Sequence, residues 1–209
     1  MPIQQAGRQS ASRFEDHDES GDDVPLLSHE DVIAWVPQAT GSEDLIEEAV
    51  ATATGLAEEW LGRDLASASH DEYITVGELV SVLHLRNWPV TTLTSIQEEA
   101  KSTSPTTLTS DSYEIDEERG RLDRDGSYWS QGFEAVRVQY TAGYTAATLP
   151  ASLKRALLQL VAWVISTRGN VGVKSEGIDG TTLQYEEMDG PVPASIGRSL
   201  ALYARMELV

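Results

Sequence analysis

With 209 residues, 40% of them hydrophobic, the chain is long enough for one domain with a real core. No apolar run reaches the ~18 residues that a membrane-spanning helix needs, and we therefore expect no membrane contact. The first 20 residues hold no hydrophobic block of the kind found in secretory signals, so synthesis in the host cytoplasm is expected. The absence of cysteine excludes disulfides and thiolate metal sites.

The charge balance is strongly acidic. Asp and Glu number 34 against 15 Lys and Arg, which gives a net charge of −19, and only Lys101, Lys154 and Lys174 are lysines. An acid-rich, lysine-poor surface stays hydrated in molar salt, where a Debye length of ~3 Å screens self-repulsion. The composition favours a salt-loving host, with an acidic protein from a moderate environment as the alternative. In either case it argues against tight binding of nucleic-acid phosphates.

Residues 1–25 are polar and rich in Asp and Glu. Such a segment buries too little apolar surface to fold alone, so we expect a flexible acidic arm ahead of one domain over residues 26–209.

Helical signals occur at both ends of that domain. Ser28 with an acid three residues later predicts a helix over 28–36, and apolar residues at three- and four-residue spacing predict a second helix over 42–61. The same spacing predicts helices over 150–168, beginning at Pro150, and over 193–206. The tryptophans of these helices, Trp35, Trp60 and Trp163, are expected in the core.

Between residues 70 and 142 the apolar period changes from helical to alternating, which indicates short strands. Gly120 is expected at the φ > 0 position of a hairpin turn. Short strands with long tips favour a projecting element over an independent domain. The predicted fold is therefore mainly α: a small bundle of about four helices with an inserted β-hairpin or β-sheet element.

Several segments of the chain then combine into a family pattern. In chain order they are WLGRDL (60–65), LHLRNWPV (83–90), YEID (113–116), GRL (120–122), Trp129, VRVQYTAGY (136–144), LPASLK (149–154), LVAW (160–163) and RG (168–169). Together they resemble the head–tail connector proteins of tailed phages, also called adaptor or head-completion proteins. The resemblance covers roughly residues 26–209, and the acidic balance beside it suggests a haloarchaeal virus.

The resemblance implies a non-enzymatic ring subunit, dodecameric, in the neck of a virion between capsid and tail. It implies three partners: the portal protein, a downstream neck or tail protein, and genomic double-stranded DNA that passes through the lumen without sequence-specific binding. In that family the C-terminal segment docks on the portal, which here is residues 191–209. The residues expected at this contact are Arg198, Leu200, Leu202, Tyr203, Arg205, Met206 and Leu208. Packing of the same helix on its own bundle is the alternative.

Two further tryptophans, Trp88 and Trp129, lie in predicted loops and are candidates for the subunit interface.

The sequence favours neither a catalytic nor a metal-binding site, and no cofactor is expected. The sequence holds no phosphate loop, no nucleophile elbow and no metal-binding histidine pair. The groups at 29–31 and 70–72 combine a histidine with acids, but a helix start and a strand entry explain them. Acidic pairs such as those at 47–48, 58–59 and 117–118 follow from composition, and residues 123–126 predict a turn rather than a calcium loop.

Two alternatives to the adaptor hypothesis stay open: another neck component such as the stopper, and a small halophilic enzyme or binding domain.

Overall fold

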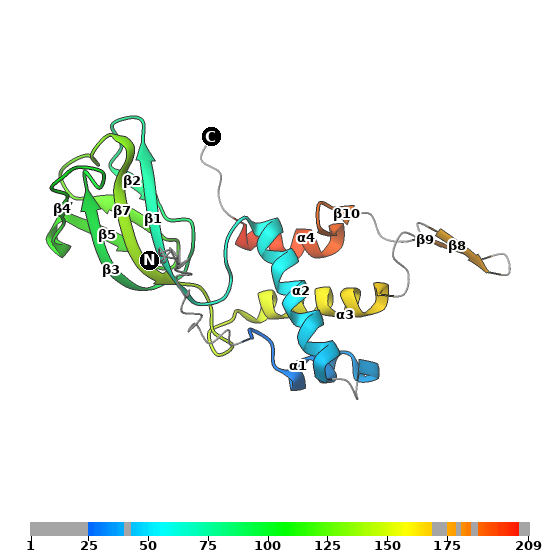
Figure 1. Ribbon diagram of the computed structural model, residues 1–209. Helices are drawn as coiled ribbons and strands as arrows, with labels where there is room; N and C mark the ends of the chain where they lie inside the picture. Colours follow the sequence, from blue (N-terminus) through cyan, green and yellow to red (C-terminus); the bar gives the residue numbers. More distant parts are fainter. Residues whose placement is uncertain (1–24, 40–42, 169–174, 179–180, 185–187, 205–209) are drawn as a thin grey trace, which may run out of the picture.

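The computed structural model describes residues 25–39, 43–168, 175–178, 181–184 and 188–204. The chain forms a helical unit and a β unit, each with its own hydrophobic core. The β unit is inserted between the second and third helices and lies beside the helices in Figure 1. Two connecting segments, residues 62–67 and 143–148, join the units.

The helical unit packs four α-helices, and α3 contacts each of the other three. Two short 3-10 helices, Pro37–Ala39 and Ala201–Tyr203, follow α1 and α4. The α-helices are α1 (His29–Trp35), α2 (Glu43–Leu61), α3 (Ala151–Thr167) and α4 (Ala194–Leu200).

Helix α1 begins with the capping pattern that its sequence predicts. The Ser28 hydroxyl accepts a hydrogen bond from the Asp31 amide at 3.2 Å, and the Asp31 carboxylate accepts one from the Ser28 amide at 3.2 Å. The Lys154 ammonium donates to the other Asp31 oxygen at 2.7 Å, and this bond is the largest cause of the lowered Asp31 pKa. The contact fastens α1 to α3.

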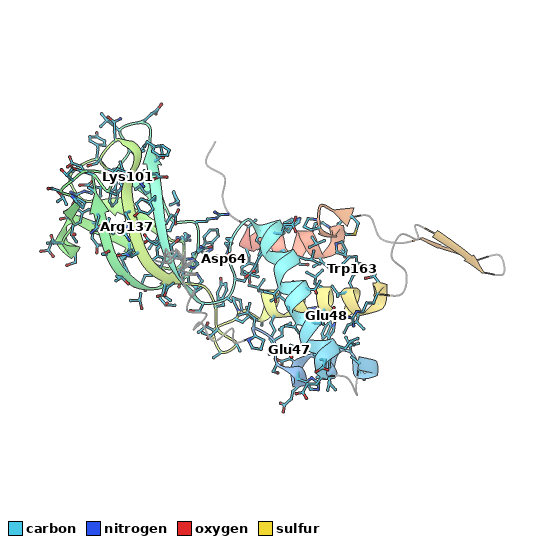
Figure 2. The ribbon with its side chains drawn as sticks, viewed as in Figure 1. Glu47, Glu48, Asp64, Lys101, Arg137 and Trp163 are labelled. Carbon is cyan, nitrogen blue, oxygen red and sulfur yellow. The ribbon has the colours of Figure 1, made fainter. Side chains whose placement is uncertain are left out.

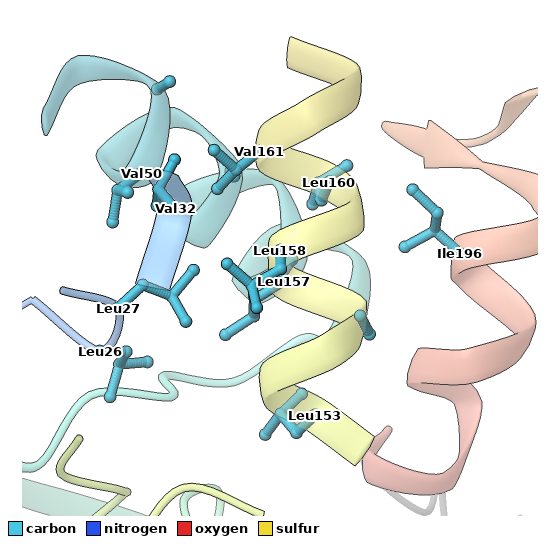
Figure 3. Packing of buried hydrophobic residues seen from close by; sticks show 14 of the residues in the cluster. Leu26, Leu27, Val32, Val50, Leu153, Leu157, Leu158, Leu160, Val161 and Ile196 are labelled. Atoms are coloured by element: carbon cyan, nitrogen blue, oxygen red, sulfur yellow. The ribbon is translucent and has the colours of Figure 1, made fainter. Parts of the chain in front are cut away.

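The helical core is built from the apolar stripes that the sequence predicts for α2 and α3. Figure 3 shows Leu157 and Val161 of α3 beside Val32 and Val50, with Ile196 of α4 across the helix. Burying each such side chain contributes roughly 1.5–3 kcal/mol.

The helical tryptophans depart from expectation. Trp35 is 44% exposed, and Trp60 and Trp163 are half-buried against the core. Predicting Trp35 as a core residue was wrong, because α1 ends there and the indole projects past the packed face.

The β unit consists of two antiparallel sheets. One has the strand order β1-β7-β3-β4 and the other β2-β6-β5. The central strand β7 pairs with β1 on one side and β3 on the other. The strands are β1 (Ala68–Val76), β2 (Val82–His84), β3 (Val90–Glu98), β4 (Thr106–Thr107), β5 (Tyr113–Asp116), β6 (Arg121–Arg124) and β7 (Gly132–Ala142).

These two sheets correct the predicted fold class. The molecule is not a mainly α bundle with an inserted β-hairpin or β-sheet element, since seven strands enclose a separate core. Alternate residues of β7, Val136, Val138, Tyr140 and Ala142, point into that core, and Trp129 closes it. The fold is therefore α+β. Gly120, with φ +60°, takes the predicted turn position between β5 and β6.

The C-terminal region is less helical than predicted. Helix α4 and its 3-10 extension end at Tyr203, and residues 205–206 of the predicted helix lie outside the described residues, as does the predicted arm up to residue 24. Two short strand pairs precede α4: β8 (Ser175–Ile178) with β9 (Thr181–Gln184), and β10 (Met188–Asp189) with β11 (Val192–Pro193). None of the helices in the described ranges is long and apolar enough to cross a bilayer.

Candidate assembly surfaces and the junction between the units

The two connecting segments lie against each other and against the turn before β3. The Tyr144 amide donates to the Leu65 carbonyl at 2.7 Å, and the Ser67 amide donates back to the Tyr144 carbonyl at 2.9 Å. The Gly143 amide donates to the Pro89 carbonyl at 2.9 Å. A side chain at Gly143 has no room, because its Cβ would lie 2.4 Å from the Ala66 carbonyl oxygen. The residues 62–67, 87–89 and 143–144 form what we call the junction.

Arg63 lies at the centre of the junction and is 2% exposed. Its Nε donates to the Tyr203 carbonyl at 3.0 Å, and its Nη1 donates to the Trp88 carbonyl. The guanidinium lies 4.0 Å from the centroid of the Trp88 ring and 5.8 Å from that of Tyr144. Burial lowers the pKa of Arg63 from its usual value. One side chain thus touches the end of α2, the β unit and the C-terminal segment.

Asn87 organises a second polar group beside it. Its Oδ1 accepts from the Asp64 amide at 2.9 Å, and its Nδ2 lies 3.1 Å from His70 Nδ1. Its own amide donates to the Tyr140 hydroxyl at 3.3 Å, which in turn donates to Glu72 at 2.7 Å. Burial, and then the bond to Glu72, raises the pKa of Tyr140. Figure 2 shows Asp64 between the two units.

This hydrogen-bond network gives the histidine of the group at 70–72, His70, a structural role. His70 and Glu72 face the junction, whereas Asp71 forms a two-pronged pair with Arg137 on the exposed face of β1 and β7, at 2.8 and 2.6 Å. The three residues therefore do not converge on one point. Lys101 pairs with Glu134 at 2.6 Å nearby on the β unit (Figure 2).

The remaining acidic motifs are dispersed. Glu48 pairs with Arg168, Glu58 accepts from the Leu65 amide at 2.7 Å, and Asp123 pairs with Arg121. Residues 125–126 form a turn with Gly126 at φ +60°. Among the described residues, no group of three or more His, Asp or Glu side chains is arranged to hold a metal ion.

The predicted portal-contact residues divide by exposure. Arg198 is exposed and Leu202 is 85% exposed, whereas Leu200 is fully buried in the helical core. Tyr203 is half-buried, with its hydroxyl 2.5 Å from that of Ser152. The other three predicted contacts, Arg205, Met206 and Leu208, lie outside the described residues.

The two interface tryptophans also differ in exposure. Trp129 is 1% exposed, and its indole donates to the Ser81 carbonyl at 2.9 Å, so it supports the β core and has no surface to offer a neighbour. Trp88 is half-buried with one face on Arg63.

Sequence reasoning missed an apolar surface at one end of the β unit. Leu79, Tyr128 and Phe133 are 64%, 58% and 75% exposed. Leu79 and Tyr128 lie in loops, and Phe133 is the second residue of β7. These segments are neighbours, because the Trp129 amide donates to the Val80 carbonyl and Val76 pairs with Gly132. The only signal in the sequence is three large apolar residues in turn-rich segments.

A cleft of about 410 Å³ lies between residues 25–29 and α2. Its floor is apolar, with Leu27, Ile46 and Val50, and its rim carries Glu43 and Glu47. Both rim side chains are exposed acids on successive turns of α2, which gives the opening a negative rim.

Large apolar side chains are exposed at the surface, and in the part of the chain that the structure describes the acids form no cluster that could hold a metal ion. A family model for head completion proteins matches residues 25–206, so the chain belongs to the head completion protein family. It is a structural component of the connection between the head and the tail of the virion.

Solved structures share the fold. One is a chain from the neck of the empty gene transfer agent particle with sixfold symmetry, 18% identical, with a TM-score of 0.57 over 88% of this chain and 92% of that one. Another is from the neck of the native particle with twelvefold symmetry, 17% identical, with a TM-score of 0.55 over 85% and 90%. A third is from the native virion, 17% identical, with a TM-score of 0.58 over 89% and 94%. The search of curated proteins found no match.

Proposed function

We propose that this protein assembles into a dodecameric ring beneath the portal, extends the DNA channel and offers the next neck or tail protein its platform. The observation that carries the proposal is the family match across residues 25–206. Similar folds in particle necks with sixfold and twelvefold symmetry support a closed ring. The subunit needs no catalytic residue for this role.

The net charge of −19 suits a channel that conducts DNA. Clustered Lys and Arg bind DNA phosphates, whereas an acidic channel wall repels them. The duplex can then slide through the channel without sequence-specific binding.

For the portal contact we propose residues 191–209, and within the described part Arg198 and Leu202 are exposed. An apolar side chain that is 85% exposed gains most from burial in a partner's pocket. Leu202→Asp is expected to weaken binding to the cognate portal by roughly 10-fold or more, because it puts a charge into that pocket. Binding is measured by sedimentation of the complex in molar salt.

Thr106→Asp is the control for this variant. It places the same charge on an exposed residue of β4, so portal binding should stay at the wild-type level. Equal binding by Leu202→Asp and wild type would place the portal contact elsewhere on the subunit.

We also propose that the host is a halophile, plausibly a haloarchaeon, on the strength of the acid excess and the scarcity of lysine. Salt screens the repulsion among 34 acids, so Tm should rise steadily between about 0.1 M and 2 M KCl. Thermal unfolding followed by circular dichroism checks this. A Tm that is flat or falls with KCl would favour an acidic protein of an ordinary environment.

A further inference from the structure

Arg63 lies where three parts of the chain meet, and it bonds to two of them through backbone carbonyls. It lies two residues past the end of α2, and it donates to the Trp88 carbonyl of the β unit and to the Tyr203 carbonyl of the C-terminal segment, the latter at 3.0 Å. Carbonyl oxygens cannot move away by rotating a side chain. The guanidinium therefore fixes the relative position of two backbone segments that are more than 100 residues apart.

The charge of Arg63 makes this arrangement costly. Among the described residues Arg63 has no ion-pair partner, and its Nη2 has no hydrogen-bond partner within 3.5 Å. The Tyr144 side chain opposes only part of the effect of burial, because the pKa of Arg63 is still lowered. Burying a cation without an ion pair costs several kcal/mol before aromatic and carbonyl contacts offset part of it. If packing alone mattered here, an apolar side chain of similar length would fill the space at lower cost. A role in orientation explains why a forked, charged donor is present.

The neighbouring contacts indicate what that orientation serves. Leu202, the most exposed of the large hydrophobic residues described, immediately precedes Tyr203. Tyr203 is tied at its carbonyl to Arg63 and at its hydroxyl to Ser152 on α3. The Trp88 segment, in turn, leads into β3 of the large sheet. Arg63 thus links the C-terminal segment to the β unit through its two hydrogen bonds.

We propose that Arg63 is a positioning residue that sets the angle between the helical and β units and couples it to the C-terminal segment. The link to docking rests on the proposed portal contact, whereas the angle itself is a property of the single subunit. When the segment docks, Arg63 aligns the β unit with it, so that every subunit of a ring presents its β unit in the same orientation.

The test measures the distance between the units by pulsed electron spin resonance. The chain has no cysteine, so Glu59→Cys on α2 and Glu114→Cys on β5, both exposed, provide the only two label sites. The labelled wild type should give one narrow distance distribution. Arg63→Met keeps the stem but removes both hydrogen bonds, and it is expected to broaden the distribution roughly twofold. The link between the Trp88 and Tyr203 segments is then lost, although the backbone hydrogen bonds of the junction remain.

Arg63→Lys and Arg86→Met complete the set. Lysine retains the charge but lacks the two forked N–H donors of the guanidinium, so the distance distribution should have an intermediate width. If circular dichroism shows that Arg63→Met does not fold, Arg63→Lys takes its place in the test. Arg86 is exposed in the same segment, so its Met variant should match wild type. A narrow, unshifted distribution in a folded Arg63→Met or Arg63→Lys would overturn the proposal.

Portal binding provides the second readout. Arg63→Met should bind roughly 10-fold more weakly if docking and orientation are coupled. The spin-resonance experiment uses the isolated subunit and therefore tests the angle between the units without the portal. A broadened distribution with unchanged portal binding would support the role of Arg63 in setting that angle and would contradict its role in docking. Failure of Leu202→Asp to weaken binding would count against the proposed docking segment alone.

Discussion

Gly143→Ala is expected to destabilise the protein by about 3–5 kcal/mol. Gly143 has φ +113°, a conformation that costs an L-residue roughly 1–3 kcal/mol, and its new Cβ would lie 2.4 Å from the Ala66 carbonyl oxygen and 2.9 Å from that of Leu65. The clash is removed only if the two connecting segments separate. That separation breaks the hydrogen bonds of Tyr144 with Leu65 and Ser67. For a domain of this size the fall in Tm should be on the order of 10 °C.

Gly55→Ala is the control for this substitution. Gly55 lies within α2, and no atom lies within 4 Å of the position its Cβ would take. Alanine there should stabilise the helix by about 0.5–1 kcal/mol. Urea unfolding measures both variants. A Gly143→Ala protein as stable as wild type would mean that the connecting segments are not packed as described.

Leu157→Ala is expected to cost about 2–5 kcal/mol. The side chain is fully buried on α3, the helix that contacts each of the other three, so the cavity it leaves is lined by more than one helix (Figure 3). Surrounding residues can close such a cavity only in part, because their own positions are fixed by separate helices.

Leu202→Ala tests the same change at an exposed position. At 85% exposure it should alter the free energy of unfolding by no more than about 0.5 kcal/mol. Guanidinium denaturation measures the free energy of unfolding of wild type and both variants. If this free energy falls with denaturant at the same slope in all three, the variants differ in stability and not in the compactness of the unfolded state. Similar losses for Leu157→Ala and Leu202→Ala would contradict the packing of α3 at the centre of the helical core.

The helices were predictable because their signals are local. Ser28 and Asp31 mark the start of α1 within one turn, and the apolar stripe of α2 repeats over its whole length. The alternation of apolar and polar residues predicted the strands, but it did not predict how large the β unit is. Ala68 pairs with Ala142 and Val82 with Asp123, and such distant partners leave no mark in either segment alone.

The junction shows the same limit. Arg63 and Asn87 are single polar residues without a repeating spacing, and only the folded chain brings Arg63 to the carbonyls of Trp88 and Tyr203. Trp129 lies in a loop of polar residues, so sequence favoured an interface role, and its burial follows from the sheets that close around it. The exposed Phe133 likewise depends on the path of the loop before β7.

The most direct test of the proposed role is electron microscopy of the purified protein mixed with the cognate portal in molar salt. A second ring stacked coaxially beneath the portal, with twelve subunits, is the predicted result. A bare portal beside unassembled protein would contradict an adaptor ring and would move the protein to a more distal position in the neck.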